Sequence, residues 1–146
     1  MYNWMVRDWM TPDPITVQPT TTLPQALEVM AQHSIRRLPV VDKGRLVGIV
    51  TRGDLRSGQP SQATSLSFFE IHYLLERVTL DRLMTRNPVT VADDATITEA
   101  ARLMLQHKIS GLPVVKGGHL VGIITESDIF RLVVRTWEKQ PEPLMA

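Results

Sequence analysis

The chain has 146 residues, of which 43% are hydrophobic and 21% charged, a balance typical of a soluble globular domain. Its formal net charge of +1 favours neither nucleic acid nor a membrane surface as a partner. The absence of cysteine excludes a disulfide framework, a thiol nucleophile and thiolate metal sites, and is consistent with a reducing cytoplasm, the localisation we expect. The first residues lack the long apolar core of a secretory signal, and no apolar run is long enough to span a membrane.

The N-terminal segment, residues 1–9, carries Trp4 and Trp9, which we expect to pack on the domain or on a partner chain. Residues 10–14 predict a turn, because their two prolines oppose helix. The next run, residues 15–17, is β-prone.

A first helix is predicted by Thr22 and Gln25, which have the spacing of a capping box, and by an apolar stripe that ends near His33–Ser34. The stripe consists of Leu23, Ala26, Leu27 and Met30. Two β-branched runs, residues 40–41 and 46–50, predict a hairpin that turns at Lys43–Gly44.

Thr51 opens a second helix, which Gly58 and Pro60 cut short. Residues 58–79 form a linker with an insert, in which Leu66, Phe69 and Tyr73 have helical spacing. We therefore predict a short packed helix there, whose apolar stripe makes core or dimer contacts.

The segment from Met10 to Arg56 occurs a second time at a constant offset of 74 residues, as the pair Asp54 and Asp128 shows. The second copy predicts a capping box at Thr96 and Glu99, a hairpin turn at Gly117–Gly118, and a final helix over about 127–137. The predicted segments are repeat 1 over 10–57, repeat 2 over 80–138 and a loose tail over 139–146. Because a unit of this size is marginal alone, we expect the two copies to share one core.

The shared motifs are Met-Thr before Pro-Ile-Thr-Val or Pro-Val-Thr-Val, Leu-Pro-Val-Val before each hairpin, and Thr-Arg-Gly-Asp or Thr-Glu-Ser-Asp at the helix entries. With these motifs in order and repeated, the chain resembles a stand-alone tandem pair of CBS domains, over about residues 6–134. The resemblance implies an α+β fold of two β-α-β-β-α repeats packed about a pseudo-twofold axis, and usually a homodimer. It also implies clefts that bind AMP, ADP, ATP or S-adenosylmethionine and a regulatory role towards another protein.

The Thr-x-x-Asp motif at residues 51–54 and 125–128 has two interpretations. As a capping box, the hydroxyl caps an amide and the acid complements the helix dipole, with no ligand required. As a ligand site, the helix N-terminus and threonine hydroxyl bind phosphate, and the aspartate accepts hydrogen bonds from ribose hydroxyls. Gly48 and Gly122, three residues before each motif, would allow close backbone approach.

In proteins that this chain resembles, the motif of one repeat faces the first strand and the pre-proline segment of the other. Carried over, the favoured cleft consists of Thr125, Ser127, Asp128, Thr16, Ile35, Arg36, Arg37, Leu38 and Pro39. The second cleft consists of Thr51, Asp54, Thr90, Ile109, Ser110, Gly111, Leu112 and Pro113. The first is favoured for phosphorylated ligands because it has two arginines, although these can also be a solvated surface pair. Unpaired main-chain groups at the strand entries would recognise adenine.

The remaining candidates favour structural roles. His33 and His107 occupy equivalent helix C-termini, where a cation or polar cap is favourable, and neither has metal-ligand spacing to other residues. No nucleophile, base and oxyanion site are arranged together, so we expect no enzyme and no catalytic cofactor. The alternative to the nucleotide-sensing module is an interaction scaffold, in which Thr-x-x-Asp only caps helices. The sequence identifies neither the ligand nor a regulated partner.

Overall fold

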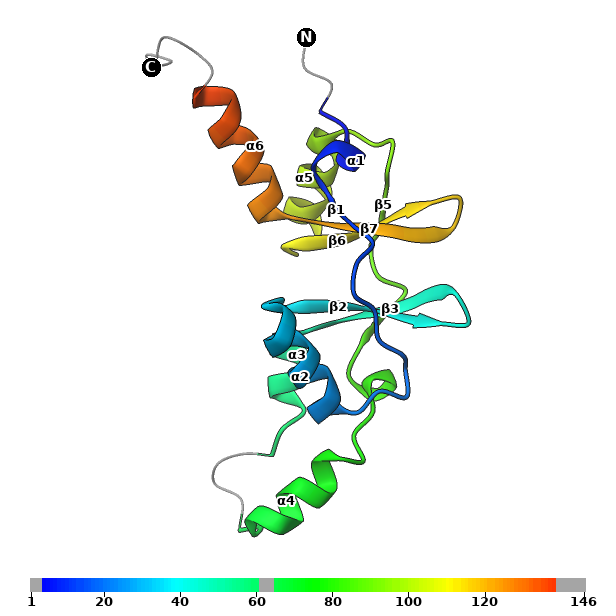
Figure 1. The fold of residues 1–146 in the computed structure, drawn as a ribbon, viewed down its shortest axis with the longest axis vertical. Coiled ribbons are helices and arrows are strands. Elements are labelled where there is room, and N and C mark those ends of the chain that lie inside the picture. The colour runs from blue at the N-terminus through cyan, green and yellow to red at the C-terminus, as the bar shows by residue number, and fades with distance from the viewer. Residues whose placement is uncertain (1–3, 61–64, 139–146) are drawn as a thin grey trace. The chain divides into compact units, whose positions relative to one another are not determined.

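The computed structural model describes residues 4–60 and 65–138 (Figure 1). The predicted tail over 139–146, part of the linker and the first three residues lie outside the described residues. The chain divides into two compact units. Unit 1 consists of Met1–Pro14 and Val89–Ala146, and unit 2 consists of Ile15–Pro88.

Unit 2 contains the first repeat and the linker. In chain order its elements are α2 (Leu23–His33), β2 (Arg37–Asp42), β3 (Arg45–Thr51), α3 (Arg52–Ser57), α4 (Phe68–Leu75), the 3₁₀ helix η1 (Leu80–Arg82) and β4 (Thr85–Arg86).

The local signals of the first repeat act as predicted. Thr22 and Gln25 form the reciprocal capping box, and Ser34 ends α2 in the left-handed conformation. The hairpin turns through Lys43 and Gly44, whose φ angles of 51° and 80° match the twist of the flanking strands. The predicted helix and hairpin are therefore confirmed.

Unit 1 contains the second repeat and the N-terminal segment. Its elements are α1 (Val6–Trp9), β1 (Thr11–Pro12), β5 (Val91–Ala92), α5 (Ile97–His107), β6 (Gly111–Lys116), β7 (His119–Thr125) and α6 (Glu126–Glu138). Helix α6 continues for 13 residues, whereas its counterpart α3 has six. At the start of α5, Thr96 accepts from the Glu99 amide.

Each unit has a small sheet that includes a segment from outside its repeat. In unit 1 the strand order is β1-β7-β6-β5, and in unit 2 it is β2-β3-β4. The predicted turn over 10–14 is wrong in part, since Thr11 pairs with Ile123 in an antiparallel ladder, as Thr85 pairs with Ile49 in unit 2. Pro12 is compatible with β1 because this strand lies at a sheet edge, where a missing N–H donor is tolerated.

The predicted first strands are shorter than expected. Val17 forms only a single parallel bridge to Val40, and the equivalent strand in the second repeat, β5, begins at Val91.

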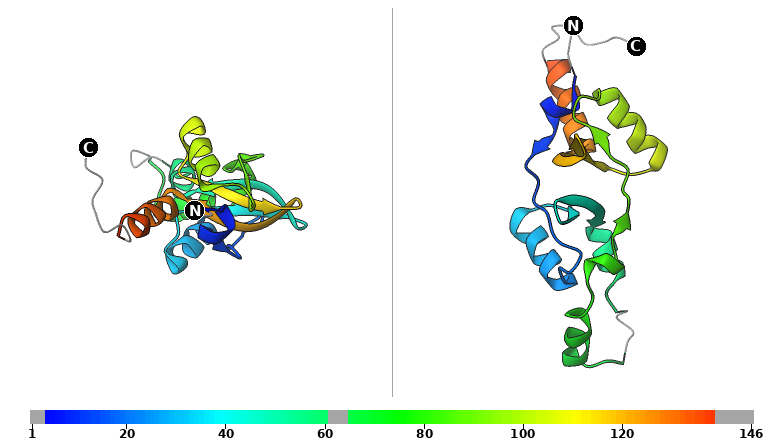
Figure 2. Two further views of the ribbon diagram at one scale, coloured as in Figure 1. Left: turned by 90° about the horizontal axis from the view of Figure 1, so that it is seen from above. Right: turned by 90° about the vertical axis from the view of Figure 1, so that its right-hand side faces the viewer.

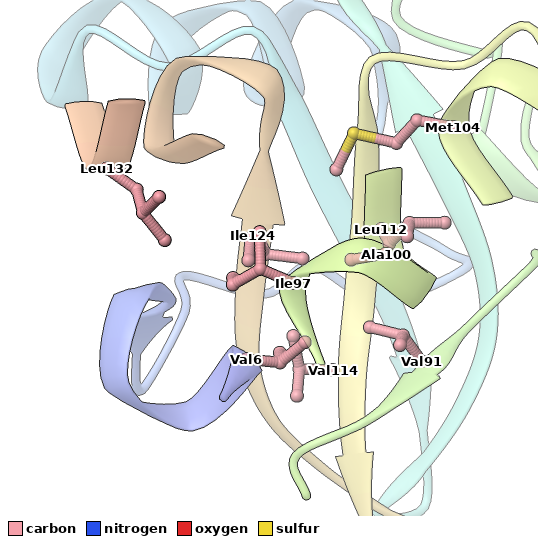
Figure 3. Packing of buried hydrophobic residues seen from close by; sticks show 9 residues of the cluster. All are labelled: Val6, Val91, Ile97, Ala100, Met104, Leu112, Val114, Ile124 and Leu132. Atoms are coloured by element: carbon pink, nitrogen blue, oxygen red, sulfur yellow. The ribbon is translucent and has the colours of Figure 1, made fainter. Parts of the chain in front are cut away.

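The buried hydrophobic residues form two clusters, one in each unit, so the prediction of a single shared core is wrong. In unit 1, side chains from α1, α5, α6 and the sheet point toward one another (Figure 3). The members are Val6, Val91, Ile97, Ala100, Met104, Leu112, Val114, Ile124 and Leu132. Each sheet is covered by helices of its own unit, so each unit buries its own set of apolar side chains.

The outer segments complete these cores. Trp4 and Trp9 pack against the unit 1 cluster, and the Arg135 guanidinium lies 5.5 Å from the centre of the Trp9 ring. Figure 2 shows α1 (blue) beside α6 (orange) in unit 1. In unit 2, Leu80 of η1 is fully buried, so the start of the predicted repeat 2 belongs to the core of unit 2.

Helix α4 forms as predicted, and its last residue, Leu75, packs against the unit 2 cluster. The predicted contact of the Phe69 and Tyr73 stripe with the core is wrong, and the alternative, a dimer contact, stays a prediction. None of its residues is buried, and Phe68 and Phe69 are 77% and 83% exposed. A Ser67 cap and a His72–Glu76 contact of 3.0 Å stabilise the helix locally. No helix in the described part of the chain combines the length and apolar character needed to cross a membrane.

Candidate functional site

The first Thr-x-x-Asp motif lies at the junction of β3 and α3. The Thr51 amide donates to Asp54 Oδ2 over 2.8 Å, and the Asp54 amide donates to Thr51 Oγ1 over 3.1 Å. This is the reciprocal capping box that the sequence predicts. Asp54 is half-buried. Ser57, one turn later, donates to the Gly53 carbonyl and not to Asp54.

The second motif, at the junction of β7 and α6, shares the first contact and then differs. The Thr125 amide donates to Asp128 Oδ2 over 2.8 Å, as in the first repeat. The Thr125 hydroxyl lies 3.3 Å from that same carboxylate oxygen, to which it donates. Asp128 is 5% exposed, and it is the buried charged residue of the described core.

Arg131 makes the largest difference between the two motifs. Its guanidinium Nη1 lies 2.8 Å from Asp128 Oδ1, in an ion pair between a half-exposed arginine and a buried carboxylate. Ser57 occupies the equivalent position in the first repeat. Sequence analysis missed Arg131, although three-residue spacing on a helix is the signal for such a pair.

The pre-proline segment of each repeat lies beside the motif of the same repeat. The Arg52 amide donates to the Arg36 carbonyl over 2.8 Å, and the Glu126 amide donates to the Ser110 carbonyl over 3.0 Å. Arg37 pairs with Thr51 across the hairpin, as Gly111 pairs with Thr125. Unit 1 therefore contains three of the nine residues that the sequence assigned to the favoured cleft and six of the eight assigned to the second, and unit 2 contains the others.

The strand-entry residues are more buried than a ligand-lining role suggests. Leu38 and Leu112 are core residues with 0% exposure, and the side chains of Pro39 and Pro113 are fully buried. The Pro39 carbonyl accepts from the Val17 amide over 3.1 Å. The expectation of unpaired main-chain groups here is therefore wrong at Pro39, because the chain around Val17 occupies that edge.

Most of the other predicted site residues are more exposed to solvent than these leucines and prolines. Thr16, Arg36 and Ser127 are exposed, whereas Ile35, Thr90, Ile109 and Ser110 are half-buried. Gly111 is buried.

Equivalent grooves of about 530 Å³ run beside these segments in both units. The groove of unit 1 is apolar and includes Leu105 and Phe130, with Lys108 and Glu126 at its ends. The groove of unit 2 instead includes Arg36 and Arg52. The two repeats therefore present surfaces of different character.

Two further predictions concern glycine and histidine. A Cβ on Gly122 would lie 2.9 Å from the Thr11 carbonyl oxygen, and one on Gly48 would lie 3.0 Å from the Thr85 carbonyl oxygen. The close approach that these glycines allow is therefore to the edge strand of their own unit. His33 and His107 are the last residues of α2 and α5, as predicted, and the described residues contain no cluster of three metal-ligating side chains.

Comparison with known proteins identifies the family. The model of the CBS domain family matches residues 6–60 and 80–135, most of the chain, in two consecutive copies. The chain belongs to the CBS-domain family. The predicted α+β fold of two CBS repeats is thereby confirmed.

Three relatives cover nearly all of the chain. A CBS domain-containing protein of Dictyostelium discoideum is 38% identical over 82% of this chain and 84% of its own length. The solved CBSX2 of Arabidopsis thaliana in complex with AMP is 34% identical, with a TM-score of 0.74, over 91% of this chain and 98% of that one. The CBS domain pair of protein MJ0100, solved with 5′-methylthioadenosine and S-adenosyl-L-methionine, is 31% identical, with a TM-score of 0.75, over 90% and 97%.

Other relatives are much longer. The chain spans only 20% of an inosine-5′-monophosphate dehydrogenase of Korarchaeum cryptofilum, and similarly small shares of two further enzymes.

Proposed function

We propose that this CBS pair is a regulatory module that binds adenosine-containing ligands through the aspartates of its two Thr-x-x-Asp motifs. One observation carries the proposal. Both repeats hold the aspartate in the same way, with the threonine amide 2.8 Å from Oδ2, in a chain similar over almost its whole length to CBS pairs solved with AMP and with S-adenosylmethionine.

The chemistry of the motif suits such ligands. A carboxylate accepts hydrogen bonds and donates none, so it is matched to the 2′ and 3′ hydroxyls of ribose and not to phosphate. The threonine amide fixes one oxygen of the carboxylate, so that the side chain needs little reorganisation on binding. The N-terminus of α6, a helix of 13 residues, favours negative charge nearby.

The ligand contacts remain those predicted from the sequence. The favoured site combines Thr125, Ser127 and Asp128 with the segment around Arg36 and Arg37 of the other repeat. The second site combines Thr51 and Asp54 with Thr90 and the segment around Ser110. The ligand would tie one repeat to the other, and differential affinity for two arrangements of the repeats would transmit its presence to a regulated protein.

A thermal-shift screen with AMP, ADP, ATP, S-adenosylmethionine and GMP as control tests the proposal. A ligand at 100 times its dissociation constant stabilises a protein by about 2.7 kcal/mol. We expect a raised melting temperature with adenine ligands only, and a smaller shift in Asp128→Ala or Asp54→Ala. The absence of a shift at millimolar concentration of every adenine ligand would contradict the proposal.

The second candidate is a protein-protein interaction or dimerisation scaffold, and exposed apolar side chains favour it. Phe130, Val134 and Trp137 on α6 are 62%, 52% and 63% exposed, and they follow helical spacing. In a scaffold, Asp128→Ala would lower stability by about 1 kcal/mol through loss of the cap, with no change in ligand response.

A further inference from the structure

The two aspartates that we propose as ribose acceptors differ in how many acceptor positions remain open. A carboxylate offers about four lone-pair positions. In Asp128 three of them are used, by the Thr125 amide, the Thr125 hydroxyl and Arg131. In Asp54 the Thr51 amide uses one, and within the described residues of unit 2 no cation pairs with the carboxylate.

A ribose diol donates two hydrogen bonds, so it cannot be accepted in full by Asp128 while Arg131 stays in place. The Arg131 side chain is 55% exposed, so water or a ligand can solvate the guanidinium when it leaves the carboxylate. Ribose hydroxyls can therefore replace the guanidinium. Once displaced, the Arg131 guanidinium loses its anionic partner, unless the ligand supplies a negative charge that Arg131 can contact.

We infer that Arg131 is a specificity-determining residue that exchanges Asp128 for the phosphate of the incoming ligand. This inference rests on the proposed function. A nucleoside 5′-phosphate provides hydroxyls for Asp128 and an anion for the released guanidinium, which binds phosphate oxygens through paired N–H groups. A neutral nucleoside displaces Arg131 without providing a new partner. The Asp128 site therefore selects phosphorylated adenosine ligands, and the Asp54 site, with Ser57 in place of Arg131, discriminates less by ligand charge.

The internal repeat provides the matched control. The background is the variant Asp54→Ala, which leaves only the Asp128 site. In this background, isothermal titration calorimetry measures the affinities for AMP and for adenosine, once with Arg131 present and once with Arg131→Ser. Serine is the residue that the first repeat has at this position. We expect Arg131→Ser to lower the preference for AMP over adenosine by about tenfold, because AMP loses a charged hydrogen bond and adenosine loses a competitor. Arg131→Lys should restore part of the preference.

The reciprocal change tests the same inference if Arg131→Ser fails to fold. In Asp128→Ala, which leaves only the Asp54 site, Ser57→Arg should raise the preference for AMP over adenosine. An unchanged ratio of the two affinities in either experiment, with binding retained, would overturn the role of Arg131 and leave the proposed function intact. If S-adenosylmethionine binds to the folded wild-type protein but AMP and adenosine do not, the inference alone fails. If no adenine ligand of the thermal-shift screen binds, the proposed function itself fails, and the inference with it.

Discussion

Replacing Gly122 by alanine tests how the edge strand β1 packs on β7. The new Cβ would lie 2.9 Å from the Thr11 carbonyl oxygen and would overlap the side chain of Met10. Met10 packs against the unit 1 core, and Thr11 is held in the ladder with Ile123, so neither can move aside without loss of contacts. Overpacking of this kind costs about 2 kcal/mol.

Urea unfolding followed by far-UV circular dichroism measures this loss. In a thermal unfolding experiment, a loss of about 2 kcal/mol in a chain of this size lowers the melting temperature by about 4–8 °C. Gly53→Ala is the control, since a Cβ there meets only Thr51 Oγ1, at 3.7 Å, and the residue lies within α3. We expect that variant to be stabilised by about 0.5–1 kcal/mol. Wild-type stability in Gly122→Ala would refute the described packing and return the glycine to a role in ligand approach.

Three further variants test the assignment of segments to cores and caps. Leu80→Ala should lower the free energy of unfolding in urea by about 2–5 kcal/mol, because the side chain is fully buried in unit 2; a loss below about 1 kcal/mol would show that Leu80 does not belong to that core. Thr22→Ala should lower the free energy of unfolding by about 1 kcal/mol through loss of the capping box, whereas Thr22→Ser should retain most of it. Phe69→Ser should change the stability of the isolated chain by less than about 0.5 kcal/mol, since the ring is 83% exposed; a large loss would mean that α4 is covered in solution.

The elements that the sequence predicts well are those whose signals are local. The capping box at Thr22, the apolar stripe of α2 and the Lys43–Gly44 turn each depend on residues a few positions apart. The same signals are repeated in the second copy, where the turn lies at Gly117 and Gly118. Because the motifs recur at a constant offset of 74 residues, both the repeat structure and the family resemblance can be read from the sequence.

The sequence does not predict contacts that depend on distant segments. Nothing local indicates that Thr11 pairs with the hairpin of the second repeat, because a two-residue edge strand with proline has almost no β signal. The same limit explains the prediction of one shared core. The sequence around Val6 and Leu80 gives no indication that Val6 joins the hydrophobic cluster of unit 1 and Leu80 that of unit 2.

Within the candidate site, geometry that follows from the hairpin was predictable and was overlooked. An antiparallel hairpin that turns at Lys43–Gly44 brings Arg37 within one residue of Thr51, so each pre-proline segment lies beside its own motif. The bulge between Val40 and Val41, which shifts the register, sets the observed pairing of Arg37 with Thr51. The Asp128–Arg131 pair also follows from helical spacing. The burial of Asp128 to 5% exposure does not follow from the sequence, because it depends on how α6 packs on its unit.

The most direct test of the account is an isothermal titration of AMP into the wild-type protein, the two single variants Asp54→Ala and Asp128→Ala, and the double variant. The account predicts binding to the wild type, an affinity at least about tenfold lower at each altered site, and no measurable binding in the folded double variant. Undiminished binding in the double variant, or no binding of AMP or any other adenine ligand of the screen to the folded wild type, would contradict the claim that these aspartates hold an adenosine ligand.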